Sequence, residues 1–149
     1  MVWAEPRRSD YIGDMPHGWV AGEFIRAAWS LIAHACEADQ SLVIGAGLPA
    51  AWLVAPEGLR LHGLSTPFGR LDLDLDHPSA DTLRIRLGGT LRTPPGGVLL
   101  ELPALAGCTV SVDGLPFRAA GQTIKLISVP TVVLIRHALP SSQSAPRSP

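Results

Sequence analysis

The sequence predicts an α+β fold that is mainly β, with one N-terminal helix packed on an antiparallel β-sandwich of about eight strands. Residues 11–36 form the one long run with helical periodicity. After Gly58, leucines alternate with charged residues over several short segments, which is typical of half-buried antiparallel strands. The chain also has 15 Gly and 14 Pro among its 149 residues, and these supply the turns that such a fold needs.

The predicted helix begins near Pro16, because proline is tolerated in a first turn, and Asp14 lies just upstream at the positive end of the helix dipole. The opposite side of the helix is also small and apolar, so the helix requires neighbours on more than one side. The sequence therefore indicates either missing helices or a partner. The apolar stripe recurs at steps of three and four residues and comprises Val20, Phe24, Ala27 or Ala28, Leu31, Ile32 and Ala35.

The predicted strands have a clear inward and outward face. Residues 71–75 alternate leucine with Asp, and residues 83–87 alternate leucine or isoleucine with Arg. If the two segments pair through a turn at 77–81, the Asp row faces the Arg row, and each pair contributes roughly 0.2–1 kcal/mol. Asp113 and Gly114 predict a tight hairpin. Further strands are expected at residues 42–44, 59–64, 98–102, 109–112, 122–127 and 131–136.

The predicted organisation has four parts. Residues 1–10 are polar and form a lead-in, and residues 11–40 contain the helix. Residues 41–138 form the sandwich. Residues 139–149 are rich in Pro and Ser, and we expect a disordered tail there.

Composition excludes several classes of partner. The net charge is −1 and Lys and Arg are not clustered, so we expect no nucleic-acid binding. No run approaches the ~18 apolar residues of a membrane span, and the first ten residues lack an apolar signal segment, so we expect neither a membrane partner nor an export signal. The localisation stays unknown. Cys36, on the helix, and Cys108, in a strand, fit no metal spacing, and we expect buried thiols rather than a disulfide framework.

No complete catalytic or metal-binding motif is present. Asp72, Asp74 and Asp76 resemble a calcium loop, but an EF-hand requires glycine where His77 stands and glutamate where Leu83 stands. We therefore interpret the three carboxylates as the solvated face of a strand. The histidines show no zinc spacing, and no serine-nucleophile or phosphate-binding motif occurs. We assign no catalytic residue, metal ligand or cofactor to the chain.

Asp14, His17 and Trp19 gather at the predicted helix entrance, with Glu23 one turn further on. A sugar site uses such residues, because carboxylate and imidazole bind hydroxyl groups and an indole contacts the apolar face of the ring. The alternative is structural, with Asp14 and Pro16 beginning the helix and Trp19 in the core. The spacing does not decide between them.

Two short motifs resemble the end of the catalytic domain in bacterial glycoside hydrolases of the (α/α)6-barrel, six-hairpin type, such as the α-L-rhamnosidase-like enzymes. The residues His17, Gly18 and Trp19 are similar to an HGW motif that opens a late barrel helix. The second motif, L-x-I-x-x-G-L-P-x-x-W, leads into a C-terminal β-sandwich in those families. It corresponds here to Leu42, Ile44, Gly47, Leu48, Pro49 and Trp52.

The resemblance implies that residues 11–40 are the terminal helix of a truncated barrel and that the chain is a C-terminal fragment, inactive by itself. The resemblance also implies that Asp14, His17 and Trp19 line a sugar subsite in the intact parent. The implied partners are a carbohydrate and an upstream barrel domain, with self-association through the exposed helix face as the other possibility. The alternatives are a β-sandwich module that binds glycan or protein, for which the strands offer Phe68 and Phe117, and a small enzyme that uses Asp14, His17 and Glu23.

Overall fold

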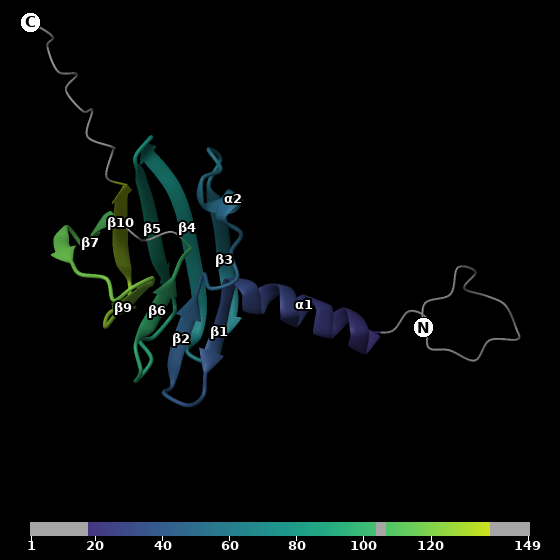
Figure 1. The fold of residues 1–149 in the computed structure, drawn as a ribbon. Coiled ribbons are helices and arrows are strands. Elements are labelled where there is room, and N and C mark those ends of the chain that lie inside the picture. The colour runs from purple at the N-terminus through teal and green to yellow at the C-terminus, as the bar shows by residue number, and fades with distance from the viewer. Residues whose placement is uncertain (1–17, 104–106, 138–149) are drawn as a thin grey trace, which may run out of the picture.

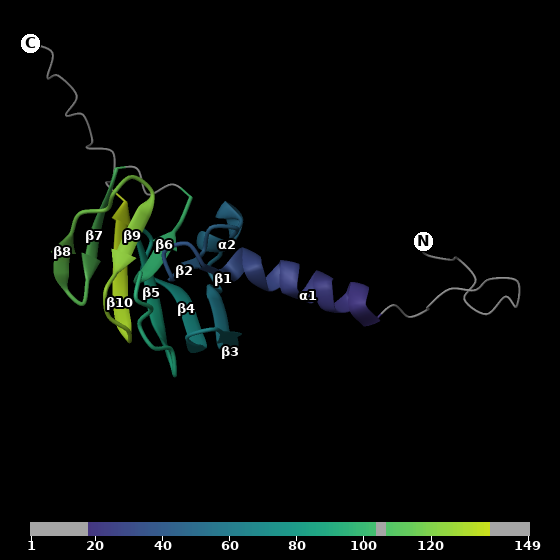
Figure 2. The same ribbon diagram turned by 90° about the horizontal axis from the view of Figure 1, so that it is seen from below.

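The computed structural model describes residues 18–103 and 107–137 of the chain, which form a two-sheet β-sandwich with one long helix (Figure 1). The two sheets lie face to face, and helix α1 (Gly18–Ile32) projects away from them (Figures 1 and 2). The described residues contain ten strands and two helices, so the predicted α+β, mainly β fold class is confirmed, with more strands than the eight expected.

The larger sheet has six strands, all antiparallel to their neighbours, in the order β3-β4-β5-β10-β7-β8. The predicted pairing of the Asp row with the Arg row is confirmed, since Asp74 lies opposite Arg86 and Asp76 lies opposite Arg84. The strands are β3 (Leu59–Thr66), β4 (Gly69–Ser79), β5 (Thr82–Gly89), β7 (Cys108–Val112), β8 (Leu115–Phe117) and β10 (Thr131–His137).

The smaller sheet has the order β1-β2-β6-β9 and contains one parallel pair, β2 with β6. The predicted sandwich is therefore not wholly antiparallel. About 50 residues separate these two strands in the chain, and the β3–β5 meander lies between them, which gives the chain the long crossover that a parallel pair needs. The strands are β1 (Ala33–Cys36), β2 (Ser41–Ile44), β6 (Val98–Glu101) and β9 (Thr123–Leu126).

The core lies between the sheets and consists almost entirely of leucine, isoleucine and valine. The alternation predicted for β4 and β5 is confirmed, because every inward leucine or isoleucine of these strands is at most 6% exposed. Asp113 and Gly114 both have positive φ, at 49° and 81°, and form the predicted tight turn between β7 and β8. The fully buried core side chains include Leu42, Ile44, Leu71, Leu73, Ile85, Leu100, Ile124, Val133 and Ile135.

The helix ends earlier than the sequence predicted. Helix α1 stops at Ile32, and the next four residues form β1, which pairs with β2. The turn between the two strands is held by Asp39, whose carboxylate accepts a hydrogen bond from the backbone N–H of Ser41 (3.1 Å). Strand pairing therefore outweighs the helical preference of the alanines in this segment. The predicted start near Pro16 lies outside the described residues.

The cysteines are less buried than predicted. Cys36 lies in edge strand β1 and Cys108 in β7 of the other sheet, and both are partly exposed, so the prediction of buried thiols is wrong. No disulfide joins them. Within the described part of the chain, no helix has both the length and the apolar character to cross a bilayer.

The core makes a direct stability prediction. Ile85→Ala removes a fully buried side chain from a central strand and should lower the free energy of unfolding by about 2–5 kcal/mol. Urea denaturation measures this change. The matched control is Ile127→Ala, the same substitution at a side chain that is 83% exposed, and it should change stability by less than about 0.5 kcal/mol. Equal effects of the two variants would contradict the assignment of the core.

Candidate functional site

The structure describes one of the three residues predicted to line a sugar subsite. Asp14 and His17 lie outside the described residues. Trp19 stands in the first turn of α1 and is 71% exposed, so it is not a core residue of the described chain. The alternative, in which Trp19 is part of the core, is therefore excluded for this sandwich. The role of Trp19 in a sugar subsite stays a prediction.

Helix α1 buries none of its 15 residues against the rest of the described chain. The predicted packing of the helix on the sandwich is therefore wrong for most of its length. Exposed apolar side chains follow one another along it: Trp19, Val20, Phe24, Ile25, Trp29 and Leu31. Figures 1 and 2 agree that the helix extends outward from the edge of the sandwich near β1 and β3.

One strip of α1 faces its own sandwich. It carries two polar residues, Arg26 and Ser30, together with Trp29, and these line a corner hollow whose other wall is the turn between β3 and β4. Phe24 lies on another side of the helix and is 74% exposed, whereas Ile25, four residues before Trp29, borders this strip and is 47% exposed. A helix that docks on its own domain presents its apolar side to it. Helix α1 instead leaves Val20 and Phe24 exposed, so the described sandwich does not cover this apolar face.

The second sequence motif anchors the end of α1. The backbone N–H of Gly45 donates to the carbonyl of Ile32 (2.8 Å), and that of Gly47 donates to the carbonyl of Leu31 (3.0 Å). These bonds satisfy carbonyl groups that a helix end leaves unpaired. A Cβ on Gly47 would lie 2.7 Å from the Cα of Leu31, so glycine allows this close approach. We call this contact the glycine clasp.

The rest of the motif is structural as well. Leu42, Ile44 and Leu48 are at most 4% exposed and belong to the core. Pro49 precedes the short helix α2 (Ala50–Leu53), and Trp52 in that helix is 48% exposed. The motif therefore positions α1 and exposes one aromatic ring, and its other side chains are packing residues.

The outer face of the six-stranded sheet carries an ordered charge network. The guanidinium of Arg84 binds the carboxylate of Asp76 through two bonds, of 2.8 Å and 2.6 Å. Arg86 contacts the same carboxylate at 3.3 Å and Asp74 at 3.7 Å. Hydrogen bonds from Arg84 are the largest cause of a lowered pKa at Asp76. Partial burial opposes this lowering, and the charges of both arginines reinforce it.

The edge of this network is completed by a histidine. His62 in β3 lies 3.8 Å from Asp72 and 3.5 Å from Asp74. Asp72 also accepts a hydrogen bond from the backbone N–H of Gly63 (2.7 Å), at a bulge in the β3–β4 pairing. The three carboxylates therefore interact with cations and backbone rather than converging on an empty centre. Among the described residues, no group of three or more Asp, Glu, His or Cys has a metal-binding arrangement.

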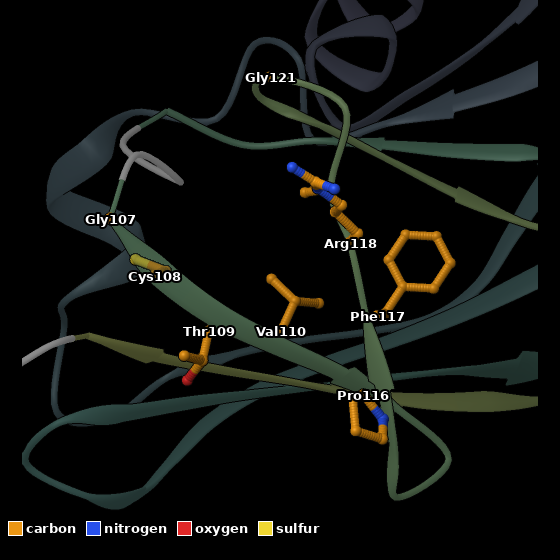
Figure 3. Close-up of a pocket in the computed structure, with 9 residues that line it drawn as sticks. Gly107, Cys108, Thr109, Val110, Pro116, Phe117, Arg118 and Gly121 are labelled. Carbon is orange, nitrogen blue, oxygen red and sulfur yellow. The ribbon is translucent and has the colours of Figure 1, made fainter.

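A hollow of about 570 Å³ lies where the β7–β8 hairpin opens (Figure 3). The strands diverge beyond the pair formed by Val110 and Phe117. Figure 3 shows Val110 between the two chain segments and Arg118 extending across the opening from the opposite segment. Cys108 also lines the hollow, with its Sγ 3.3 Å from Nδ1 of His137. Burial raises the pKa of this thiol, which disfavours the thiolate form.

Comparisons with known proteins do not establish a family. No protein-family model and no curated protein matches the sequence. Among solved structures, the chain is similar to a GH127 β-L-arabinofuranosidase from Geobacillus stearothermophilus T6, with 12% identity and a TM-score of 0.40. The match covers 81% of this chain but 19% of the length of that protein. A likeness this weak carries no conclusion about fold or function.

The glycine clasp predicts opposite effects for two Gly→Ala substitutions, one at a closely packed glycine and one at an exposed glycine of the helix. Gly47→Ala should destabilise the chain by about 1–3 kcal/mol, because the added methyl group overlaps the backbone of Leu31. Chemical denaturation followed by circular dichroism measures the loss. Gly22→Ala is the matched control, since its Cβ would meet nothing within 4 Å, and it should increase helicity. A destabilising Gly22→Ala together with a neutral Gly47→Ala would contradict the clasp.

The charge network predicts that part of the folding stability is lost in acid. Because the pKa of Asp76 is lowered in the folded chain, its stabilising effect is fully present above the ordinary carboxyl pKa and is lost as the pH falls through the folded pKa. Asp76→Asn should lower stability by up to about 1 kcal/mol at pH 7, because both partners of the pair remain partly exposed. The difference between wild type and variant should shrink as the pH falls below the ordinary carboxyl pKa and vanish once Asp76 is protonated in the folded chain as well. Urea titrations at several pH values measure it, and Glu57→Gln, at an exposed residue, is the control.

Proposed function

We propose that this chain is the structural, C-terminal β-sandwich part of a glycoside hydrolase-like protein, and that it has no glycosidase activity by itself. In this proposal, α1 packs against the helices of an (α/α)6 barrel. The observation that carries the proposal is the orientation of α1, whose strip with Arg26, Trp29 and Ser30 faces its own sandwich while its apolar face is exposed.

The exposed apolar area supports a large interface. Trp19 and Phe24 are 71% and 74% exposed, so their side chains together expose roughly 200–350 Å². Covering that area is worth about 5–9 kcal/mol at ~25 cal/mol per Å². This is comparable to the whole stability of a typical domain, and patches of this size mark interaction sites.

The glycines of α1 support a helix as the neighbour. A Cβ on Gly18 or Gly22 would meet nothing within 4 Å, so no contact in the described chain requires glycine there. Glycine inside a helix costs about 1 kcal/mol relative to alanine. Small residues on a helix allow the backbone of a second helix to approach closely, which supplies a reason for Gly22 in a barrel.

The two sequence motifs also support the proposal by their positions. The glycine clasp lies at the anchored end of α1, where the barrel would pass into the sandwich. Gly18 and Trp19 of the HGW motif lie at the opposite end, in the first turn of the 15-residue helix. In a parent enzyme, Trp19 would stand with Asp14 and His17 at a sugar subsite.

Hydrolysis in the parent would use two carboxylates, one as acid and one as base or nucleophile. We place both in the upstream barrel and neither in this chain. The strand carboxylates Asp72, Asp74 and Asp76 interact with Arg84, Arg86 or His62 on an open sheet face. They surround no enclosed space that would exclude water from a reacting glycosidic bond.

The alternative of a glycan-binding sandwich module has less support. Phe68 and Phe117, the aromatic residues expected to form its platform, both pack partly buried against the core. A flat aromatic platform on a sheet face therefore does not occur among the described strand residues.

The proposal predicts that the isolated chain self-associates through α1. It should bind the dye ANS and elute as an oligomer, because the apolar face is exposed to water. Phe24→Ser combined with Ile25→Ser should reduce both effects, and Trp52→Ser, at an aromatic residue outside α1, should not. Light scattering after gel filtration measures the mass. A monomer without dye binding would contradict an exposed interface.

Two further observations test the glycosidase part of the proposal. The DNA that precedes the Met1 codon should encode helical hairpins in the same frame, and a promoter and ribosome-binding site directly before it would count against a barrel parent. The purified chain should not hydrolyse nitrophenyl glycosides. Turnover that is lost in His17→Ala would instead support a small independent enzyme.

A further inference from the structure

The corner between α1 and the β3–β4 turn is a hollow of about 270 Å³ with both aromatic and polar walls. The helix side presents Arg26, Trp29 and Ser30, which lie on one strip because they are three or four residues apart. The opposite wall is formed by Ser65, Thr66 and Pro67. We propose that this corner binds a sugar acid, which is a saccharide ring that carries a carboxylate.

Both walls of the corner are held in place. The glycine clasp anchors Ile32, and Trp29 and Arg26 stand only about 4.5 Å and 9 Å from it along the helix axis. In the opposite wall, the hydroxyl of Thr66 donates to the carbonyl of Gly69 (2.6 Å) and accepts from the N–H of Phe68 (3.2 Å). The corner is therefore preorganised, which reduces the entropic cost of binding.

Trp29 provides a surface for the apolar face of a sugar ring. Its side chain lines the corner and is 49% exposed. Tryptophan contributes a large rigid apolar surface with one polar N–H, which suits a ring that has an apolar face and polar edges. Ala33, Ala35 and Pro67 also line the hollow, so its apolar lining is continuous with the indole.

Arg26 provides the site for the carboxylate. Its side chain is 78% exposed and contacts Glu23 at 3.4 Å, with Glu23 itself 63% exposed. An exposed pair of this kind contributes little, so the guanidinium can turn to a ligand at small cost. Arginine binds carboxylates through two parallel hydrogen bonds, which gives the corner a preference for an acidic sugar over a neutral one.

His34 and Ser65 account for the choice of a saccharide over a flat aromatic acid. Nδ1 of His34 contacts the carbonyl of Ser30 (3.3 Å), and its other ring nitrogen can bind a ligand hydroxyl. The hydroxyl of Ser65 adds a donor and acceptor on the opposite wall. A saccharide satisfies both groups through its hydroxyls, whereas a benzoate ring leaves them unpaired.

This inference stands on residues of the corner and is independent of the proposed barrel parent. The corner uses the strip of α1 with Arg26, Trp29 and Ser30, and the interface proposed above uses Val20 and Phe24 on the opposite side of the helix. Both surfaces can therefore be occupied at the same time. The signal that the sequence offered was the spacing of Arg26, Trp29 and Ser30, which becomes informative once the β3–β4 turn is placed opposite.

A nuclear magnetic resonance titration of the 149-residue chain tests the site. The indole N–H signals of the four tryptophans are followed with D-galacturonate or D-glucuronate, and Trp29→Phe assigns the signal of interest. We expect a saturable shift of the Trp29 signal with a Kd of about 1 mM. Arg26→Ala should weaken binding by about tenfold or more, and Arg26→Lys should weaken it less, because the charge remains but the two-bond geometry is lost.

The controls distinguish binding at this site from nonspecific binding. Trp29→Ala should abolish binding, while Trp52→Ala, at a tryptophan of nearly equal exposure, should leave the Kd unchanged. Equal affinity for D-galactose would overturn the carboxylate assignment, and equal affinity for benzoate would overturn the saccharide assignment. No shift of the Trp29 signal up to about 50 mM uronate, well above the expected Kd, would overturn the site itself. Both Trp29 and Arg26 are exposed, so circular dichroism should show these variants folded.

Discussion

The glycine clasp is the contact on which the arrangement of this chain depends. Two backbone N–H groups, from Gly45 and Gly47, bind the last carbonyls of α1, and the following leucine enters the core. This contact is small, but it sets the direction in which the helix leaves the sandwich. It also decides which side of the helix faces the β3–β4 turn and which side faces solvent.

The consequence is a helix with two distinct surfaces. One strip of the helix closes a corner with the sandwich, where Arg26 and Trp29 stand against the turn around Thr66. Its opposite, apolar face exposes Val20 and Phe24 to solvent. The sandwich is thus complete in its own core and incomplete at its helix. We base the proposal of a structural module joined to a helical domain on this combination.

The charged sheet face shows that a row of carboxylates resembling a calcium site can be a structural feature. Asp72, Asp74 and Asp76 stand in a row because alternate residues of a strand point to the same side. The register brings Arg84 and Arg86 opposite them, and His62 follows from the neighbouring strand. Opposite charges across neighbouring strands stabilise the sheet and its register. The network therefore contributes to folding, and its open geometry gives no support for catalysis.

The sequence by itself determined the fold class, most strands, the β4–β5 pairing and the hairpin at Asp113, because alternation and turn residues act over a few neighbouring positions. Only the tertiary structure decided that α1 ends at Ile32, that β2 and β6 are parallel, and that the apolar face of the helix is left uncovered. These features depend on contacts between segments far apart in the chain, such as β2 with β6. Local periodicity carries no information about such contacts, and the corner at Trp29 was hidden from the sequence for the same reason.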